Sequence, residues 1–288
     1  MNHYRPKHIL YGLLFWTLAA VAMAFPAFSQ EESLTLDPIT GNYHLRYLED
    51  GNRIVEMTWV PATKVKPNLK SWFLAPPSGV ILYRYTVAVE AKSSQALSSF
   101  GFDASQAIGT RNDKPIINFP QGIPMGWKGR LSPTFRSKGI SVAWFFAQHN
   151  DQGTAGLQPG QKQGGFYVDS KDLPGVGTVR LYGSTPLQGF PGEGPGESEV
   201  GLKLREVQMG FVPRLAAIPR ISVSTPFNAA GVLSNIQKHV KEDMASMQLI
   251  DPVLLGLIDR GLTQAIAAAQ GGNTISLLHE IKNLRKIL

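Results

Sequence analysis

Two short segments of the chain combine aromatic rings with cations, a combination that suits the recognition of sugars. Trp72 and Phe73 stand between a lysine and two prolines, and Trp127 lies in turn-like sequence beside Lys128 and Arg130. Aromatic faces with flanking donors suit sugar rings or anionic glycans, and the same surface could meet a protein partner. Alternatively, both tryptophans fold back and seal the ends of a core. We take these five residues as the candidate binding residues.

Catalytic patterns are not recognisable in the chain. The histidines beyond the first ten residues, His44, His149, His239 and His279, show neither a His-x3-His nor a His-Glu-x2-His spacing. His149 precedes Asn-Asp-Gln-Gly, which could place an imidazole beside a carboxylate but is also a preferred turn composition. No serine stands in a Gly-x-Ser-x-Gly elbow. We therefore expect a protein that is not an enzyme and that uses no metal and no cofactor.

A glycine-rich stretch, 192–197, is similar to a phosphate-binding loop in its glycine content but lacks the residues that bind phosphate. It lacks the Walker A glycine pattern and the following Gly-Lys-Ser/Thr, and its two carboxylates would repel a phosphate. Glu193, Glu197 and Glu199 could instead offer oxygen ligands to calcium, but the Asp/Asn spacing of a dedicated site is missing. A solvated linker is the better interpretation.

The composition excludes several classes of protein. Of 288 residues 43% are hydrophobic, 17% are charged and none is cysteine, so disulfides, thiolate metal sites and cysteine nucleophiles are ruled out. The apolar content is too high for a disordered chain. The 28 basic residues against 21 acidic ones are spread thinly along the sequence, so we do not expect a nucleic-acid partner.

The first 29 residues have the layout of a secretory signal peptide. Arg5 and Lys7 precede the uncharged apolar run Ile9 to Ala24, and small-residue patterns follow it. We expect cleavage after Ser29, and a periplasmic or extracellular bacterial protein that is not integral to the membrane. The alternative is an uncleaved anchor, for which the run is short of the ~20 residues that span a bilayer.

Residues 31–217 carry the pattern of an antiparallel β-sandwich, either jelly-roll or immunoglobulin-like. The clearest hairpin runs from Tyr43 to Val60 around Asp-Gly-Asn, and alternating strands are predicted over Val80 to Glu90 and Ile140 to Phe146. Weaker strand predictions are Ala96 to Phe102, Gly165 to Asp169, Val179 to Leu181 and Gly201 to Met209. No helices are interleaved, which favours a sandwich over an α/β fold.

After a linker, 218–225, the spacing of apolar residues becomes helical, and residues 226–288 are expected to form a helical hairpin or a three-helix domain. The first helix starts near Thr225-Pro226 or Asn228, the second at Asp251-Pro252, and the third after Gly271-Gly272. Short links make neighbouring helices antiparallel. The unit has an excess of aliphatic side chains, so it is expected to dock on the sandwich or to self-associate.

The run from Leu257 to Asn273, followed by Leu277, Leu278 and Leu284, resembles the helical segment of FIMAH-type modules at the ends of secreted bacterial proteins. Upstream, the Pro-Gly and Gly-Phe pairs between 157 and 175 are similar to those of uncharacterised secreted bacterial sandwich proteins. Neither resemblance implies an activity or a catalytic residue.

Three classes of function therefore stand open. The first is a secreted or periplasmic binding module for an envelope glycan or a protein partner, which the secretion signal and the aromatic segments favour. The second is a structural or assembly protein of the envelope that acts through its C-terminal helices. The third is a hydrolase whose site the sequence does not reveal.

Overall fold

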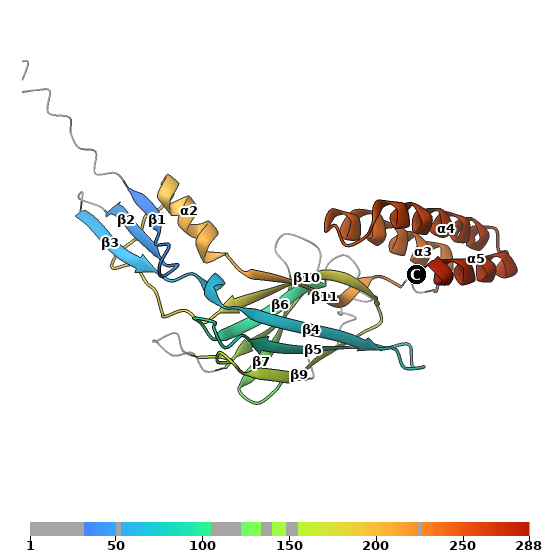
Figure 1. The fold of residues 1–288 in the computed structure, drawn as a ribbon, viewed down its shortest axis with the longest axis horizontal. Helices are drawn as coiled ribbons and strands as arrows, with labels where there is room; N and C mark the ends of the chain where they lie inside the picture. Colours follow the sequence, from blue (N-terminus) through green and yellow to red (C-terminus); the bar gives the residue numbers. More distant parts are fainter. Residues whose placement is uncertain are drawn as a thin grey trace, which may run out of the picture. The chain divides into compact units, whose positions relative to one another are not determined.

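The computed structural model describes residues 32–49, 53–104, 122–133, 140–147, 155–223 and 226–287. It is mainly β, with three antiparallel sheets and four α-helices in this described part (Figure 1). The chain forms two compact units. One contains the residues up to Trp59 together with Phe190–Arg205, and the other contains Val60–Gly189 and Glu206–Leu288. This division differs from the boundaries expected from the sequence.

The first unit is built on a three-stranded sheet of β1 (Ser33–Leu36), β2 (Tyr43–Glu49) and β3 (Arg53–Trp59). The predicted hairpin is confirmed, with Tyr43 opposite Trp59 and Tyr47 opposite Val55; its turn, 50–52, lies outside the described residues. The Phe190 ring stacks on Trp59 and meets Tyr47 edge-on, each at 5.9 Å between centroids. Besides Tyr47 and Trp59, the buried hydrophobic residues in the described part of this unit are Leu45, Val55, Val200 and Leu204.

The second unit contains the other two sheets. The five-stranded sheet has the order β11-β10-β6-β8-β7 and the three-stranded sheet the order β4-β5-β9. Their bounds are β4 (Pro67–Leu74), β5 (Ile81–Val89), β6 (Leu97–Ala104), β7 (Trp127–Pro133), β8 (Ile140–Phe146), β9 (Lys162–Ser170), β10 (Leu173–Gly183) and β11 (Val212–Ile221). A 3₁₀ turn, η1 (Ala62–Lys64), precedes β4.

The main hydrophobic core takes side chains from both of these sheets. Trp144 of β8 is fully buried and stacks on Phe100 of β6 at 4.9 Å, while Phe166 of β9 meets Phe100 edge-on at the same distance. The buried hydroxyls of Tyr83 and Tyr85 donate to backbone carbonyls, so these rings can be buried without an unpaired polar group. The alternation expected for β5 is confirmed.

Side-chain hydrogen bonds and one bridge join the two sheets at their edges. At one edge the Ala217 amide of β11 donates to Ser71 Oγ of β4 at 2.9 Å. At the other edge Gly122, just before β7, forms an isolated bridge with Tyr167 of β9. The backbone groups of the edge strands are therefore partly covered within the chain itself.

The C-terminal elements are α3 (Ala229–Lys238), the π-helix η2 (His239–Met244), α4 (Pro252–Gln270) and α5 (Thr274–Ile287). The expected starts are confirmed, because Asn228 caps α3 and Asp251 caps α4 with proline as the first helical residue. The helices pack side by side around a small core (Figure 1), whose buried members are Leu233, Ile258, Leu262, Ala265 and Leu284.

One helix and one strand conflict with the element bounds expected from the sequence. The strand expected over Gly201 to Met209 is wrong, because this segment lies in α2 (Glu199–Gln208). Val200 and Leu204 are buried one helical turn apart, which is the spacing of a helix and not the alternation of a strand. The strand is β11, which continues to Ile221 and so runs through the expected boundary at 217 into the expected linker.

Candidate functional site

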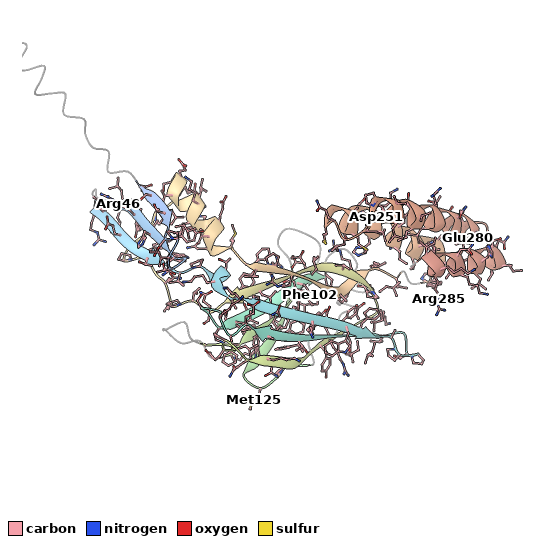
Figure 2. The ribbon with its side chains drawn as sticks, viewed as in Figure 1. Arg46, Phe102, Met125, Asp251, Glu280 and Arg285 are labelled. Atoms are coloured by element: carbon pink, nitrogen blue, oxygen red, sulfur yellow. The ribbon has the colours of Figure 1, made fainter. Side chains whose placement is uncertain are left out.

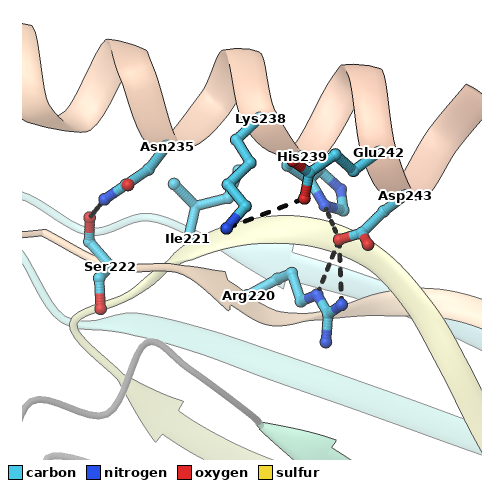
Figure 3. A pocket seen from close by; sticks show the side chains of 8 residues that line it. All are labelled: Arg220, Ile221, Ser222, Asn235, Lys238, His239, Glu242 and Asp243. Atoms are coloured by element: carbon cyan, nitrogen blue, oxygen red, sulfur yellow. Dashed lines mark hydrogen bonds and ion pairs between the residues drawn. The ribbon is translucent and has the colours of Figure 1, made fainter.

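A polar cavity with a volume of about 150 Å³ lies where η2 and α3 meet β11. His239 is only 6% exposed, and its Nδ1 lies 2.7 Å from Asp243 Oδ2 (Figure 3). The same carboxylate oxygen accepts two hydrogen bonds from the Arg220 guanidinium, at 3.0 and 3.1 Å. Burial alone would raise the pKa of Asp243, but the hydrogen bonds from His239 and Arg220 outweigh it and hold that pKa below its usual value.

This cluster connects η2 with β10 and β11, and both ring nitrogens of its histidine are hydrogen-bonded. The Val176 amide donates to His239 Nε2 at 3.1 Å, so the second ring nitrogen is also occupied and carries no proton. An imidazole held in this way has no lone pair left for a metal or for a general base. Among the described residues, no group of three His, Cys, Asp or Glu side chains could hold a metal ion.

Three side chains align on the outer face of the three-stranded sheet β4-β5-β9. Trp72 of β4 pairs with Arg84 of β5, and Arg84 pairs with Tyr167 of β9. Residues that pair directly across strands project to the same side of the sheet, so the three side chains form one row, here called the aromatic row. Trp72 is 43% exposed, Arg84 is exposed and Tyr167 is half-buried.

The surroundings of the aromatic row are mixed in polarity. On one side of the aromatic row, Lys70 pairs with Thr86. On the other side, Leu74 pairs with Leu82, which in turn pairs with Asp169 of β9. Arg84 has no ion-pair partner among the described residues. The row therefore presents an uncompensated guanidinium between two aromatic rings about two strand spacings, or roughly 10 Å, apart.

Gly122 holds the tyrosine of this row in place. A Cβ at Gly122 would collide with the Tyr167 ring and with the Gly165 carbonyl, so only glycine allows the backbone to lie against the ring. The Gly122 carbonyl also accepts a hydrogen bond from the Trp144 indole at 3.2 Å. One side of the Tyr167 ring is thus supported by backbone that is itself fixed to the core.

The sequence-based candidates do not come together in one site. Trp72 and Phe73 lie in β4 and not in a loop, and because strand residues alternate they project to opposite faces. The Phe73 ring lies 6.2 Å from that of Tyr83 and is 45% exposed. Trp72 alone of this pair therefore belongs to the aromatic row.

The other candidate segment lies in β7, at the edge of the five-stranded sheet. Trp127 is only 6% exposed and its ring packs 5.1 Å from that of Phe166, so it is part of the core and not of a binding surface. Lys128 and Arg130 are exposed on the opposite face, where they pair with Phe145 and Ala143. These two cations are on a different sheet from Trp72.

Two members of the aromatic row, Arg84 and Tyr167, were not among the residues singled out from the sequence. Arg84 lies in the predicted strand Val80 to Glu90 and Tyr167 in the predicted strand Gly165 to Asp169, so the alternation of each strand indicates the face on which each side chain lies. Which strands are neighbours, and in which register, was not available. Only the pairing of β4 with β5 and of β5 with β9 brings the three side chains together.

The glycine-rich loop shows no gathered carboxylates. Glu199 pairs with Lys203 at 2.7 Å and Glu197 lies 3.8 Å from Arg205, so both acids are paired with cations of α2. The segment around His149 lies outside the described residues.

Comparisons of the chain with protein families, with curated proteins and with solved structures find no match, so no relative supplies a function for it. In the described part of the chain, every helix is too short or too polar to cross a membrane.

Proposed function

We propose that the protein is a non-enzymatic binding module of the bacterial envelope, periplasmic or secreted, that recognises an acidic glycan through the aromatic row. The observation that carries this proposal is the alignment of Trp72, Arg84 and Tyr167 on one accessible sheet face. Each of the three comes from a different strand, so the rigid sheet fixes their spacing before any ligand arrives.

The chemistry of the row fits a chain of carboxylated sugars. Aromatic rings take the apolar faces of sugar rings, and a guanidinium binds a carboxylate through two parallel hydrogen bonds. The exposed arginine keeps its donors available because no acid of the described chain pairs with it. An open sheet face also accommodates a polymer that continues in both directions, which a closed pocket would not.

The proposed architecture and location agree with this role. We take the two sheets that share one core in the second unit as a β-sandwich, and α3, α4 and α5 as a three-helix unit of the FIMAH-like kind. Support for the sandwich comes from the core side chains that both sheets supply. Residues 1–29 would direct the protein out of the cytoplasm and would then be removed.

The test is binding of the full mature chain to polygalacturonate, an acidic polysaccharide, with pullulan as the neutral comparison. Affinity electrophoresis of the wild type should show retardation by polygalacturonate and little by pullulan. Trp72→Ala should weaken binding by tenfold or more, since loss of an aromatic side chain that dominates an interface commonly costs about 2 kcal/mol. Arg84→Gln should remove the preference for the acidic chain.

Lys128→Gln is the matched control, because it removes an exposed cation on the other sheet. It should leave the retardation within about twofold of the wild type. Absence of binding to either polysaccharide, or equal weakening by the control, would contradict the proposal.

A further inference from the structure

The solvent-facing side of α5 carries both large aliphatic side chains and cations. Ile275 is 83% exposed, Leu278 54% and Ile281 43%. Lys282, Arg285 and Lys286 are exposed as well. The remaining exposed residues of α5 are Thr274 and His279, so this face of the helix, here called the α5 face, contains no acidic residue.

The acid of α5 lies on the other side of the helix. Glu280 and Arg285 project from different sides of α5 (Figure 2), and Glu280 is half-buried whereas the cations of the α5 face are exposed. That core is closed without the α5 face, since Leu284 is buried against Gly261 and Leu277 packs beside it. The exposed aliphatics are therefore not needed to complete the fold of the helical unit.

The charge of the α5 face favours one kind of occupant. Three cations within the last turns of a helix attract an anionic surface, and each is worth roughly tenfold or less in affinity near a membrane. Interleaved Ile and Leu side chains can enter the boundary between headgroups and acyl chains, as in interfacial helices. The face extends over about 16 Å from Ile275 to Lys286, which suits a flat surface more than a pocket.

Two other occupants could come from the protein itself, a second copy of the chain or its own N-terminal apolar run. Both fit the α5 face less well than an anionic surface does. In a symmetric dimer through this face, the acid-free surface would be opposed by itself, and like charges would meet. The apolar run Ile9 to Ala24 of the same chain contains no acid and cannot neutralise the three cations.

We infer that the α5 face binds peripherally to a bilayer rich in anionic phospholipid. This interaction is separate from glycan binding by the aromatic row, and a variant of one should leave the other intact. The lipid contact would hold the module at a membrane surface while its sheet face remains available.

The experiment is cosedimentation of the mature chain with vesicles, either of pure phosphatidylcholine or with an equal share of phosphatidylglycerol. The wild type should sediment with the anionic vesicles and not with the neutral ones, and salt should weaken binding. Lys282→Gln with Arg285→Gln should weaken it by roughly thirtyfold, the loss expected for two cations near the surface. Leu278→Gln with Ile281→Gln should also weaken it, and glutamine keeps the helix propensity high.

The control is Leu187→Gln with Lys162→Gln, which removes an exposed aliphatic and an exposed cation outside the helices. It should bind like the wild type, as should Trp72→Ala. Helix content by circular dichroism must be equal in all variants, so that a loss of binding is not a loss of fold.

Three results would overturn the inference. The first is a wild type that does not sediment with anionic vesicles, in which case an acidic protein would be the better candidate for the partner. The second is equal binding by wild type and both α5 variants. The third is a wild-type dimer in sedimentation velocity that becomes a monomer in the Leu278→Gln, Ile281→Gln variant, which would identify a second copy as the occupant.

Discussion

Replacing Asp172 by asparagine should remove much of the loss of stability that the protein undergoes as the pH rises towards neutrality. Asp172 lies between β9 and β10 and is only 2% exposed. The Val223 amide donates a hydrogen bond to its carboxyl group, but Oδ2 has no partner among the described residues. Burial raises the pKa of Asp172 to about 7.

The sign and size follow from the difference between the folded and unfolded states. In the unfolded chain an aspartate titrates near 3.9, so between about pH 4 and pH 7 the folded state binds more protons than the unfolded state. The free energy of unfolding therefore falls as the pH rises through this range and becomes level above it. About three pKa units at 1.36 kcal/mol each give an upper value of about 4 kcal/mol.

Urea unfolding followed by tryptophan fluorescence, at pH values from about 5 to 8, measures this effect. The wild type should lose stability across the series, and Asp172→Asn should lose less by about 3 kcal/mol, which is the part of the shift inside this window. Comparing the slopes removes the contribution of every other titrating group. The control is Asp169→Asn, which removes a carboxyl of β9 that takes no part in these contacts and should keep the wild-type slope. A parallel slope in Asp172→Asn would show that this carboxyl titrates normally in the folded protein.

Three further predictions test the cluster of Arg220, His239 and Asp243, the helical core and the aromatic row. Asp243→Asn should lower the free energy of unfolding by about 2 kcal/mol in a thermal melt, because Arg220 loses its ion pair, whereas Lys238→Gln, which removes an exposed pair, should cost less than about 1 kcal/mol. Leu262→Ala should cost about 2 to 5 kcal/mol and Ile281→Ala under about 1 kcal/mol by helix circular dichroism, since Leu262 is 4% exposed and Ile281 43%; equal costs would contradict this core. Gly122→Ala should displace the tyrosine of the aromatic row and reduce retardation by polygalacturonate, and unchanged retardation would show that this ring takes no part.

The elements with a strong local signal could be predicted from the sequence. Asp251-Pro252 gave the start of α4, because a capping carboxylate followed by proline fits the first turn and little else. The strand β5 was predictable because its five alternate residues from Ile81 to Val89 are all buried, while the residues between them are half-buried or exposed.

The strands β1, β4, β7 and β11 were not predicted, and for the last three there is a physical reason. Strand β4 has an exposed polar face and ends in exposed aromatics, so its alternation is hidden. Pro213 and Pro219 weaken the strand signal of β11, although an edge strand tolerates proline because one row of its amides needs no partner in the sheet. For β7 the glycines around Trp127 suggested a turn, yet the ring is in the core.

The two proposed binding faces can be tested independently of folding, because each lies on the outer side of an element whose inner side forms the core. Trp72 is on β4 while the core of that sheet is supplied by residues such as Tyr85 and Phe166, which are fully buried. Trp72→Ala and Leu278→Gln should therefore change the free energy of unfolding by about 0.5 kcal/mol or less, as surface substitutions do. Phe73→Ala should cost more, because its ring packs on buried Tyr83. If Trp72→Ala lowers stability as much as Phe73→Ala in urea unfolding, the tryptophan contributes to the core, and any loss of glycan binding must then be attributed to damage to the fold.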